Sequence, residues 1–309
     1  MFLSLSLRNK VSRDTKTFYI IIGPWIAMFV FLNVLPMVYA FYLSLTHFDG
    51  ISLPRFIGFR NYLRLISDYR FISSIYSTLI FTSLNVLFTL VVGFLIALLL
   101  NRRSKAQSFF RSVFFIPYAV PVIAIVFIWK TLLNRESGLI NIIINQFNPH
   151  FSLNLLVNFP RFSLVSMFAW QAGGAMIIFL AGLQNMPKDL IEAAEIDGAN
   201  RYFIFKNIIL PLMSPVILYQ VVVGIMLSFG VIVRPILLTS SPGAAFTAFL
   251  NQQPPFQNYF TIIYAFQQCF TNQRFGYGMA VTWVMFIIML IVTFTFLKIS
   301  SKLAYYEYE

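Results

Sequence analysis

The chain has 309 residues, of which 59% are hydrophobic and only 10% are charged, and its mean hydropathy is +0.79. Soluble domains carry about 25% charged residues, so this composition excludes a soluble globular protein and indicates a membrane protein. The net charge of +12 is typical of basic loops beside anionic lipid rather than of nucleic-acid binding, because no basic stretch alternates with aromatic residues.

Cysteine and histidine are too sparse for a metal site. Cys269 is the single cysteine, which excludes an intrachain disulfide and a cysteine-based metal site. His47 and His150 are far apart and have no ligand-type neighbours.

The apolar run at 2–7 is too short for a cleavable signal peptide and precedes the basic residues of the tail. The first span is therefore expected to act as its own targeting signal.

Six runs are long and apolar enough, or nearly so, to cross a bilayer core, which takes about 20 residues per helix. In chain order they cover residues 18–45, 71–100, 109–129, 162–184, 212–233 and 275–297. The charge-free segments 137–160 and 235–273 are not counted, because asparagines and prolines interrupt them and unpaired backbone groups are not tolerated in lipid. We predict an all-α membrane protein with a tail at 1–17, a six-span domain at 18–300 and a tail at 301–309.

Prolines fall inside three of the predicted spans, at Pro24, Pro36, Pro117, Pro121 and Pro215. One interpretation is ordinary kinking, which neighbouring helices compensate. The other is a hinge for alternating access, for which the pair Pro117 and Pro121 is the best candidate.

Lys and Arg are unevenly distributed between the connecting segments. Thirteen of the 22 lie in the N-terminal tail, in 102–111, in 188–206 and in the C-terminal tail, and the other nine lie in the longer segments 46–70, 130–161 and 234–274. The positive-inside rule places the first set in the cytoplasm. Both termini and the loop at 188–206 are therefore predicted to face the cytoplasm.

The loop between spans 4 and 5, at about 186–211, is a short polar helix followed by a glycine turn. Asp189 is expected to cap a helix that begins at Leu190, with Glu192 completing a capping box. Gly198 is expected to end that helix in the left-handed conformation, and a second helix should start near Asn200 and lead to span 5 at Leu210. The residues alone allow either a simple amphipathic connector or a docking element.

This loop resembles the coupling motif of permease subunits of binding-protein-dependent ABC importers, in the spacing Glu192-Ala193-Ala194, three residues, Gly198, nine residues, Ile208, one residue, Leu210-Pro211. Asp197, Ala199, Phe205 and Pro215 make it similar to the carbohydrate branch, which is related to the maltose and glycerol-phosphate permeases. The likeness extends over nearly the whole chain. It departs at 239–242, where Thr-Ser-Ser-Pro replaces a glycine-rich triplet, and at 77–78, where Ser-Thr replaces Asn-Thr.

The resemblance implies a type I ABC importer permease with six transmembrane helices and cytoplasmic coupling helices between spans 4 and 5. It implies contact with an ATPase through Glu192, Ala193, Ala194, Asp197, Gly198, Ala199, Phe205, Leu210 and Pro211. The chain lacks a GxxxxGK[ST] loop, so we expect no catalytic residues and no cofactor here, with ATP and Mg bound by the partner. The implied partners are a second permease of different sequence, two cytoplasmic ATPase subunits and an extracytoplasmic sugar-binding protein, at the bacterial cytoplasmic (inner) membrane.

Polar and aromatic side chains in or near the spans are candidates for a substrate path: Asn85, Trp170, Gln171, Tyr219, Gln220 and Ser228. Amides and aromatic faces suit sugar hydroxyls and rings, but hydrogen bonding between helices and anchoring at the interface explain the same residues more simply. Arg234, at the outer end of span 5, is expected to snorkel or to pair with a partner subunit rather than to meet an acidic substrate.

Other classes of membrane protein fit less well. A gradient-driven carrier would carry acidic residues within its spans, and all ten acidic residues lie outside them. A membrane-embedded enzyme would need a cluster of carboxylates or histidine near one membrane face, which the sequence does not suggest. An importer of the same type for glycerol phosphate or a polyol stays open.

Overall fold

The computed structural model describes residues 17–101, 105–135, 137–147, 154–239 and 254–300. Four helices are long and apolar enough to cross a membrane: Thr17–Ser44, Tyr69–Leu100, Arg201–Phe229 and Phe275–Ile299. Two further apolar helix pairs are bent, and counting each as one span gives the six predicted from sequence. Except for Thr17, the two predicted tails lie outside the described residues.

The first two spans are joined by a small extramembranous element. Span 1 contains a π-helical turn, η1 (Val30–Val34), and ends with α2 (Leu35–Ser44). The antiparallel strands β1 (Thr46–His47) and β2 (Arg55–Phe56) and the helix α3 (Arg60–Ile66) follow. Span 2 is the unbroken helix α4 (Tyr69–Leu100), close to the predicted 71–100.

The third and fourth spans are interrupted rather than straight. Span 3 consists of α5 (Gln107–Ala119) and α6 (Val122–Leu132), bent by 97°, and span 4 consists of α9 (Pro160–Trp170) and α10 (Gly173–Gln184), bent by 46°. The predicted span at 109–129 is thus present as a broken pair of helices, interrupted close to the proline pair Pro117 and Pro121. Pro121 stands at the break, where its ring and its missing N–H prevent α5 from continuing. Between the two pairs lie α7 (Leu139–Phe147) and α8 (Leu155–Asn158).

Span 5 starts earlier and ends earlier than the predicted 212–233. The loop helix α11 (Lys188–Ile196) is followed by α12 (Arg201–Ile204), the π-helical turn η2 (Phe205–Ile209) and α13 (Leu210–Phe229), the last three forming one continuous helix. Pro211 does not mark the start of the span, because the wider π turn before it accommodates a residue without an N–H. The helix ends at Gly230, which is its C-cap.

The last part of the chain packs across the end of the bundle that carries β1. The short helix α14 (Val233–Thr239), the 3-10 turn η3 (Phe256–Asn258) and α16 (Thr261–Phe270) precede span 6, α17 (Phe275–Ser300). None of the three short elements α14, η3 and α16 is a span, which agrees with the exclusion of 235–273 from the predicted spans. Most of the motif at 239–242 that departs from the family pattern lies outside the described residues.

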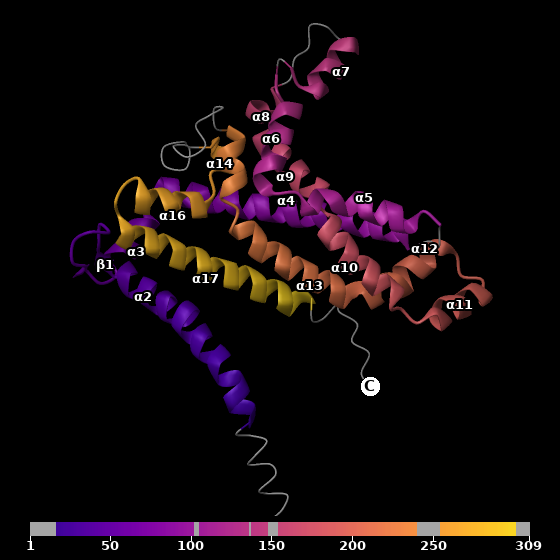
Figure 1. Cartoon of the computed structure of the whole chain (residues 1–309), viewed down its shortest axis with the longest axis horizontal. Helices are drawn as coiled ribbons and strands as arrows, with labels where there is room; N and C mark the ends of the chain where they lie inside the picture. The colour runs from indigo at the N-terminus through magenta and orange to yellow at the C-terminus, as the bar shows by residue number, and fades with distance from the viewer. Residues whose placement is uncertain (1–16, 102–104, 136, 148–153, 240–253, 301–309) are drawn as a thin grey trace, which may run out of the picture.

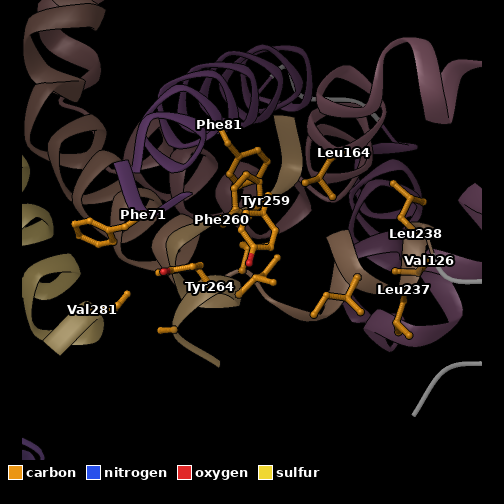
Figure 2. Packing of buried hydrophobic residues seen from close by; sticks show 14 of the residues in the cluster. Phe71, Phe81, Val126, Leu164, Leu237, Leu238, Tyr259, Phe260, Tyr264 and Val281 are labelled. Atoms are coloured by element: carbon orange, nitrogen blue, oxygen red, sulfur yellow. The ribbon is translucent and has the colours of Figure 1, made fainter. Parts of the chain in front are cut away.

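The main core lies where α4, α9, α14 and α16 meet. Phe81 is fully buried, with its ring centre 4.6 Å from that of Phe260 and 5.6 Å from that of Phe168. Figure 2 shows Phe81, Phe260 and Tyr259 together, with Leu164 beside them. A second core, which includes Phe179 from α10, forms at the other end of α4. The two bent helix pairs, α5–α6 and α9–α10, are thus packed against a hydrophobic core at each end of α4.

Span 1 is set apart from the other helices. In Figure 1, α2 runs away from the bundle, and none of the most apolar window of span 1 is buried. Its C-terminal end packs on α17, where the rings of Phe41 and Trp283 lie 5.1 Å apart. Asn33, inside the π turn, is exposed, and its amide has no hydrogen-bond partner among the described residues. A polar amide on an unpacked membrane helix costs free energy unless a neighbouring helix supplies a hydrogen-bond partner.

Asp68 joins three helices at the end of the bundle that carries β1. One carboxylate oxygen accepts hydrogen bonds from the N–H groups of Arg70 and Phe71 and so caps α4. The other oxygen accepts from the hydroxyls of Tyr264 in α16 and Tyr277 in α17, each at 2.5 Å. Burial acts to raise the pKa of Asp68, but these hydrogen bonds outweigh it and lower the pKa below its usual value.

Candidate functional site

The loop helix α11 lies outside the helix bundle. Figure 1 shows α11 at one end of the molecule, beyond α10 and α12, whereas β1, α3 and α16 lie at the opposite end. No residue of α11 is buried. Its apolar side chains Leu190 and Ile196 are 45% and 85% exposed. The helix therefore presents an amphipathic surface that the chain itself does not cover.

Gly198 ends α11 as the sequence predicts. Its φ of +81° is in the left-handed region. The Gly198 N–H donates to the Glu195 carbonyl at 3.1 Å, and the Ala199 N–H donates to the Ala194 carbonyl at 2.9 Å. This pair of bonds is the Schellman motif, which satisfies the last carbonyls of the helix and reverses the chain.

The start of α11 differs from the prediction. The helix begins at Lys188 after Pro187, and no side chain caps it. Asp189 lies within the first turn rather than at the cap, so no capping box with Glu192 exists. A proline before the first residue fixes the chain direction at this point. The Asp189 carboxylate still stabilises the helix through the positive end of its dipole.

The second half of the loop is anchored to the bundle. The Asn200 side chain accepts a hydrogen bond from the Phe203 N–H at 2.8 Å and caps α12. Ile204 is buried, and the Phe205 ring centre lies 6.2 Å from that of Phe94 in α4. Phe205, Leu210 and Pro211, predicted to contact the ATPase, are thus half-buried parts of the continuous span 5 helix. Glu192, Ala193, Asp197 and Gly198 are exposed, and Ala194 and Ala199 are partly covered.

A partly open cavity of about 760 Å³ lies between the helices of the bundle. The breaks of three helices reach it: Val120 between α5 and α6, Gln171 between α9 and α10, and Gly230 between α13 and α14. Its volume is in the range of small-molecule sites. Discontinuous membrane helices of this kind line the substrate sites of many transporters.

The position of one break is set by two adjacent glycines. A Cβ on Gly173 would lie 2.5 Å from the Phe114 carbonyl oxygen, and one on Gly174 would lie 2.7 Å from the Tyr118 ring. Only glycine allows α10 to start so close to α5.

Two glutamine side chains hold the cavity wall together. Gln171 donates to the Pro117 carbonyl at 3.1 Å. That carbonyl would be the partner of the N–H that Pro121 lacks, so the glutamine restores the hydrogen bond lost at the proline. Gln220 donates to the Ala175 carbonyl at 3.2 Å and joins α13 to α10.

Four of the six predicted path residues line the cavity, namely Asn85, Gln171, Tyr219 and Gln220. The other two do not. Ser228 is buried and accepts a hydrogen bond from the Asn85 amide at 2.9 Å, which links α4 to α13. Trp170 packs against Trp129, with ring centres 6.2 Å apart.

Arg234 also lines the cavity, and it does not snorkel. Its guanidinium donates to Gln171 Oε1 at 2.6 Å and lies 3.9 Å from the centre of the Phe168 ring. Sequence reasoning placed it at the outer end of span 5, but that span ends at Phe229, and Arg234 lies in the first turn of the separate helix α14. Thr89 and Tyr118 line the cavity too and were not predicted, although Tyr118 follows a proline inside a span.

Comparison with known proteins places these features in one family. The model of the family described as binding-protein-dependent transport system inner membrane component matches residues 89–304. A probable ABC transporter permease, YesP of Bacillus subtilis, is 28% identical over 97% of this chain and 95% of its own length. The trehalose/maltose transport system permease MalF of Thermococcus litoralis is 31% identical over 93% of this chain and 95% of its own.

The fold matches solved structures as well. A chain from the crystal structure of a bacterial ABC transporter that imports the acidic polysaccharide alginate superposes with a TM-score of 0.79. The match covers 97% of this chain and 100% of that chain, at 20% sequence identity.

Proposed function

Because this chain belongs to the family of inner membrane components of binding-protein-dependent transport systems, we propose that it forms half of the translocation pore of an ATP-driven importer for a sugar or oligosaccharide. In this proposal it hydrolyses no ATP itself. A separate ATPase supplies the energy, and an extracytoplasmic binding protein delivers the cargo.

The observation that carries the proposal is the exposed helix α11. An unburied amphipathic helix, ended by a defined turn and anchored through Ile204 and Phe205, can transmit a displacement of its docking partner to span 5. The helix continues from Arg201 to Phe229 without a break. In our proposal, Glu192 makes a charged contact with the ATPase, and Leu190 and Ile196 are covered by it.

The cavity supports the carbohydrate part of the proposal. The amides of Asn85 and Gln220 and the hydroxyl of Tyr219 lie on a wall that is otherwise mostly apolar. Such a surface suits a ligand with hydroxyl groups on an apolar ring. A relative with a named saccharide, the trehalose/maltose transport system permease MalF, also supports this part of the proposal.

Span 1 supports a second permease as a partner. An apolar helix with an exposed amide at Asn33 is stabilised in the membrane when another helix donates or accepts a hydrogen bond there. We propose that the partner is a permease of different sequence. With the basic segments inside, both termini and α11 face the cytoplasm of a bacterial cell and β1, α3 and α16 face outward.

The test is purification of the tagged chain from native membranes in mild detergent, followed by mass spectrometry of the proteins that come with it. A matched pair of variants sharpens it. Ile196→Asp removes the apolar surface of α11, and Ile66→Asp removes an isoleucine of similar exposure, 74%, at the opposite end. We expect Ile196→Asp to lower the amount of bound ATPase by about tenfold or more, and Ile66→Asp to leave it unchanged.

Two results would contradict the proposal. An intact chain that is repeatedly purified alone would favour a gradient-driven carrier. Equal ATPase recovery with both variants would show that α11 is not the docking helix.

A further inference from the structure

Among the described residues, the side chains that line the cavity carry one positive charge and no negative one. Of the side chains that line it, only Arg234 is charged. The surroundings are mainly apolar, with contributions from Val86, Phe168 and Val231. An ionised group inside a membrane protein is costly to bury without a counter-ion and marks a substrate path or a partner.

Arg234 is held in place rather than free to leave the cavity. Its terminal nitrogen donates to Gln171, and that glutamine is itself fixed by the Pro117 carbonyl. The Phe168 ring covers one face of the guanidinium. These contacts orient the group at little entropic cost to a ligand, because the side chain is already ordered.

The neutral contacts leave the charge uncompensated. Glutamine and phenylalanine carry no net charge, and the Nε of Arg234 is buried without a hydrogen-bond partner among the described residues. A guanidinium has five donors arranged in a planar fork that matches a carboxylate. The wall therefore offers a preformed cation together with amides that suit hydroxyl groups.

We propose that this cavity selects saccharides that carry a carboxylate, with Arg234 as the residue that pairs with it. The inference rests on the proposed function and names its substrate class. A single guanidinium balances a single negative charge, which favours a uronate over a dianionic sugar phosphate. The hydroxyl groups of the same ligand would meet Asn85, Tyr219 and Gln220.

The test uses three sugars that differ at one carbon: D-galactose, D-galacturonate and galactose 6-phosphate. Their binding is measured by equilibrium dialysis on the assembled permease–ATPase complex in nanodiscs, without the binding protein, so that the specificity of that protein does not enter. We expect galacturonate to bind about 10- to 100-fold more tightly than galactose, as charge-assisted hydrogen bonds contribute in other sites.

Two variants assign the preference to Arg234. Arg234→Gln should lower galacturonate binding to the level of galactose and so abolish the preference, and Arg234→Lys should retain part of it, because lysine keeps the charge but not the fork. Thermal unfolding of both variants, compared with the unaltered complex, separates a loss of selectivity from a loss of folding. If Arg234→Gln unfolds, the test rests on two measurements: the preference of the unaltered complex for galacturonate, and its partial loss in Arg234→Lys.

The outcomes separate this inference from the proposed function. Equal binding of galactose and galacturonate would overturn the inference alone, as would a preference that survives Arg234→Gln. Tighter binding of galactose 6-phosphate than of galacturonate would overturn the carboxylate in favour of a phosphate. A complex that retains its ATPase and binds none of the three sugars would overturn both the inference and the carbohydrate part of the proposed function.

Discussion

Replacing Gly198 with valine changes the backbone of the loop without creating a steric clash in this chain. A Cβ at Gly198 would meet no atom within 4 Å, so the whole effect comes from the φ of +81°. A residue other than glycine destabilises the left-handed conformation by about 1–2 kcal/mol, and a β-branched residue adopts this conformation least readily. Gly198→Val therefore destabilises the Schellman turn that ends α11.

This free energy becomes a change in the population of the correctly ended loop. A loss of about 1–2 kcal/mol corresponds to a factor of about 5–30. If the ATPase binds only the native turn, its apparent affinity for the permease falls by up to the same factor, the full loss being reached when the native turn becomes the minor state. Insertion of the chain into the membrane should not change, because the two cores and the spans are untouched.

The assay is titration of the purified ATPase onto the permease in nanodiscs, with uptake in cells as a second measurement. Gly198→Asn is the matched control, since asparagine tolerates the left-handed region better than other residues. We expect valine to cause the largest loss of affinity, alanine an intermediate loss and asparagine the smallest.

Two results would refute this reasoning. Unchanged affinity and uptake for Gly198→Val would mean that the turn has no part in coupling. Equal losses for valine, alanine and asparagine would mean that the ATPase excludes any Cβ beside Gly198, so that the presence of a side chain matters rather than φ.

Three further predictions concern the bundle. Phe81→Ala should lower the free energy of unfolding by about 3–5 kcal/mol in denaturant titrations, whereas Phe88→Ala, on an exposed face of the same helix, should have a much smaller effect. Gly173→Ala should destabilise the protein by about 1–3 kcal/mol because its Cβ would meet the Phe114 carbonyl, while Gly23→Ala, which meets no atom within 4 Å, should not; thermal unfolding compares them. The lowered pKa of Asp68 stabilises the fold fully above its ordinary value of 3.8 and less as the pH falls through the lower folded-state value. Melting temperatures measured between about pH 3 and pH 7 should therefore drop at the acid end, and Asp68→Asn should be less stable at neutral pH and lose that part of the acid dependence; a wild-type acid slope retained in Asp68→Asn would contradict the assignment.

The parts of the fold that follow from local composition could be predicted from the sequence. Long apolar runs locate α4 and α17 within two or three residues, because apolar length alone decides what spans a bilayer. Gly198 ends α11 as expected, because few residues adopt a positive φ. The positions of these two spans and of this helix end are set by residues that are close together in the sequence.

The cavity could not be predicted, because its contacts join distant segments. Gln171 bonds to Pro117, 54 residues away, and to Arg234, 63 residues away. Pro121 signals a break, but the 97° bend depends on α6 packing against α14. The predicted start of α11 at Leu190, with Asp189 as its cap, was also wrong, since an acidic residue near a helix start serves either as a cap or within the first turn.

The isolated first span has a consequence for the life of the protein in the cell. A copy synthesised without its partner leaves the Asn33 amide in lipid, while its two cores are already complete. If the proposed second permease is the partner, such a copy is folded but carries a polar amide in lipid that costs free energy until another helix satisfies it. We expect the half-life of the unpartnered chain to lengthen when Asn33 is replaced by leucine, so that this position would set subunit stoichiometry through degradation rather than through synthesis.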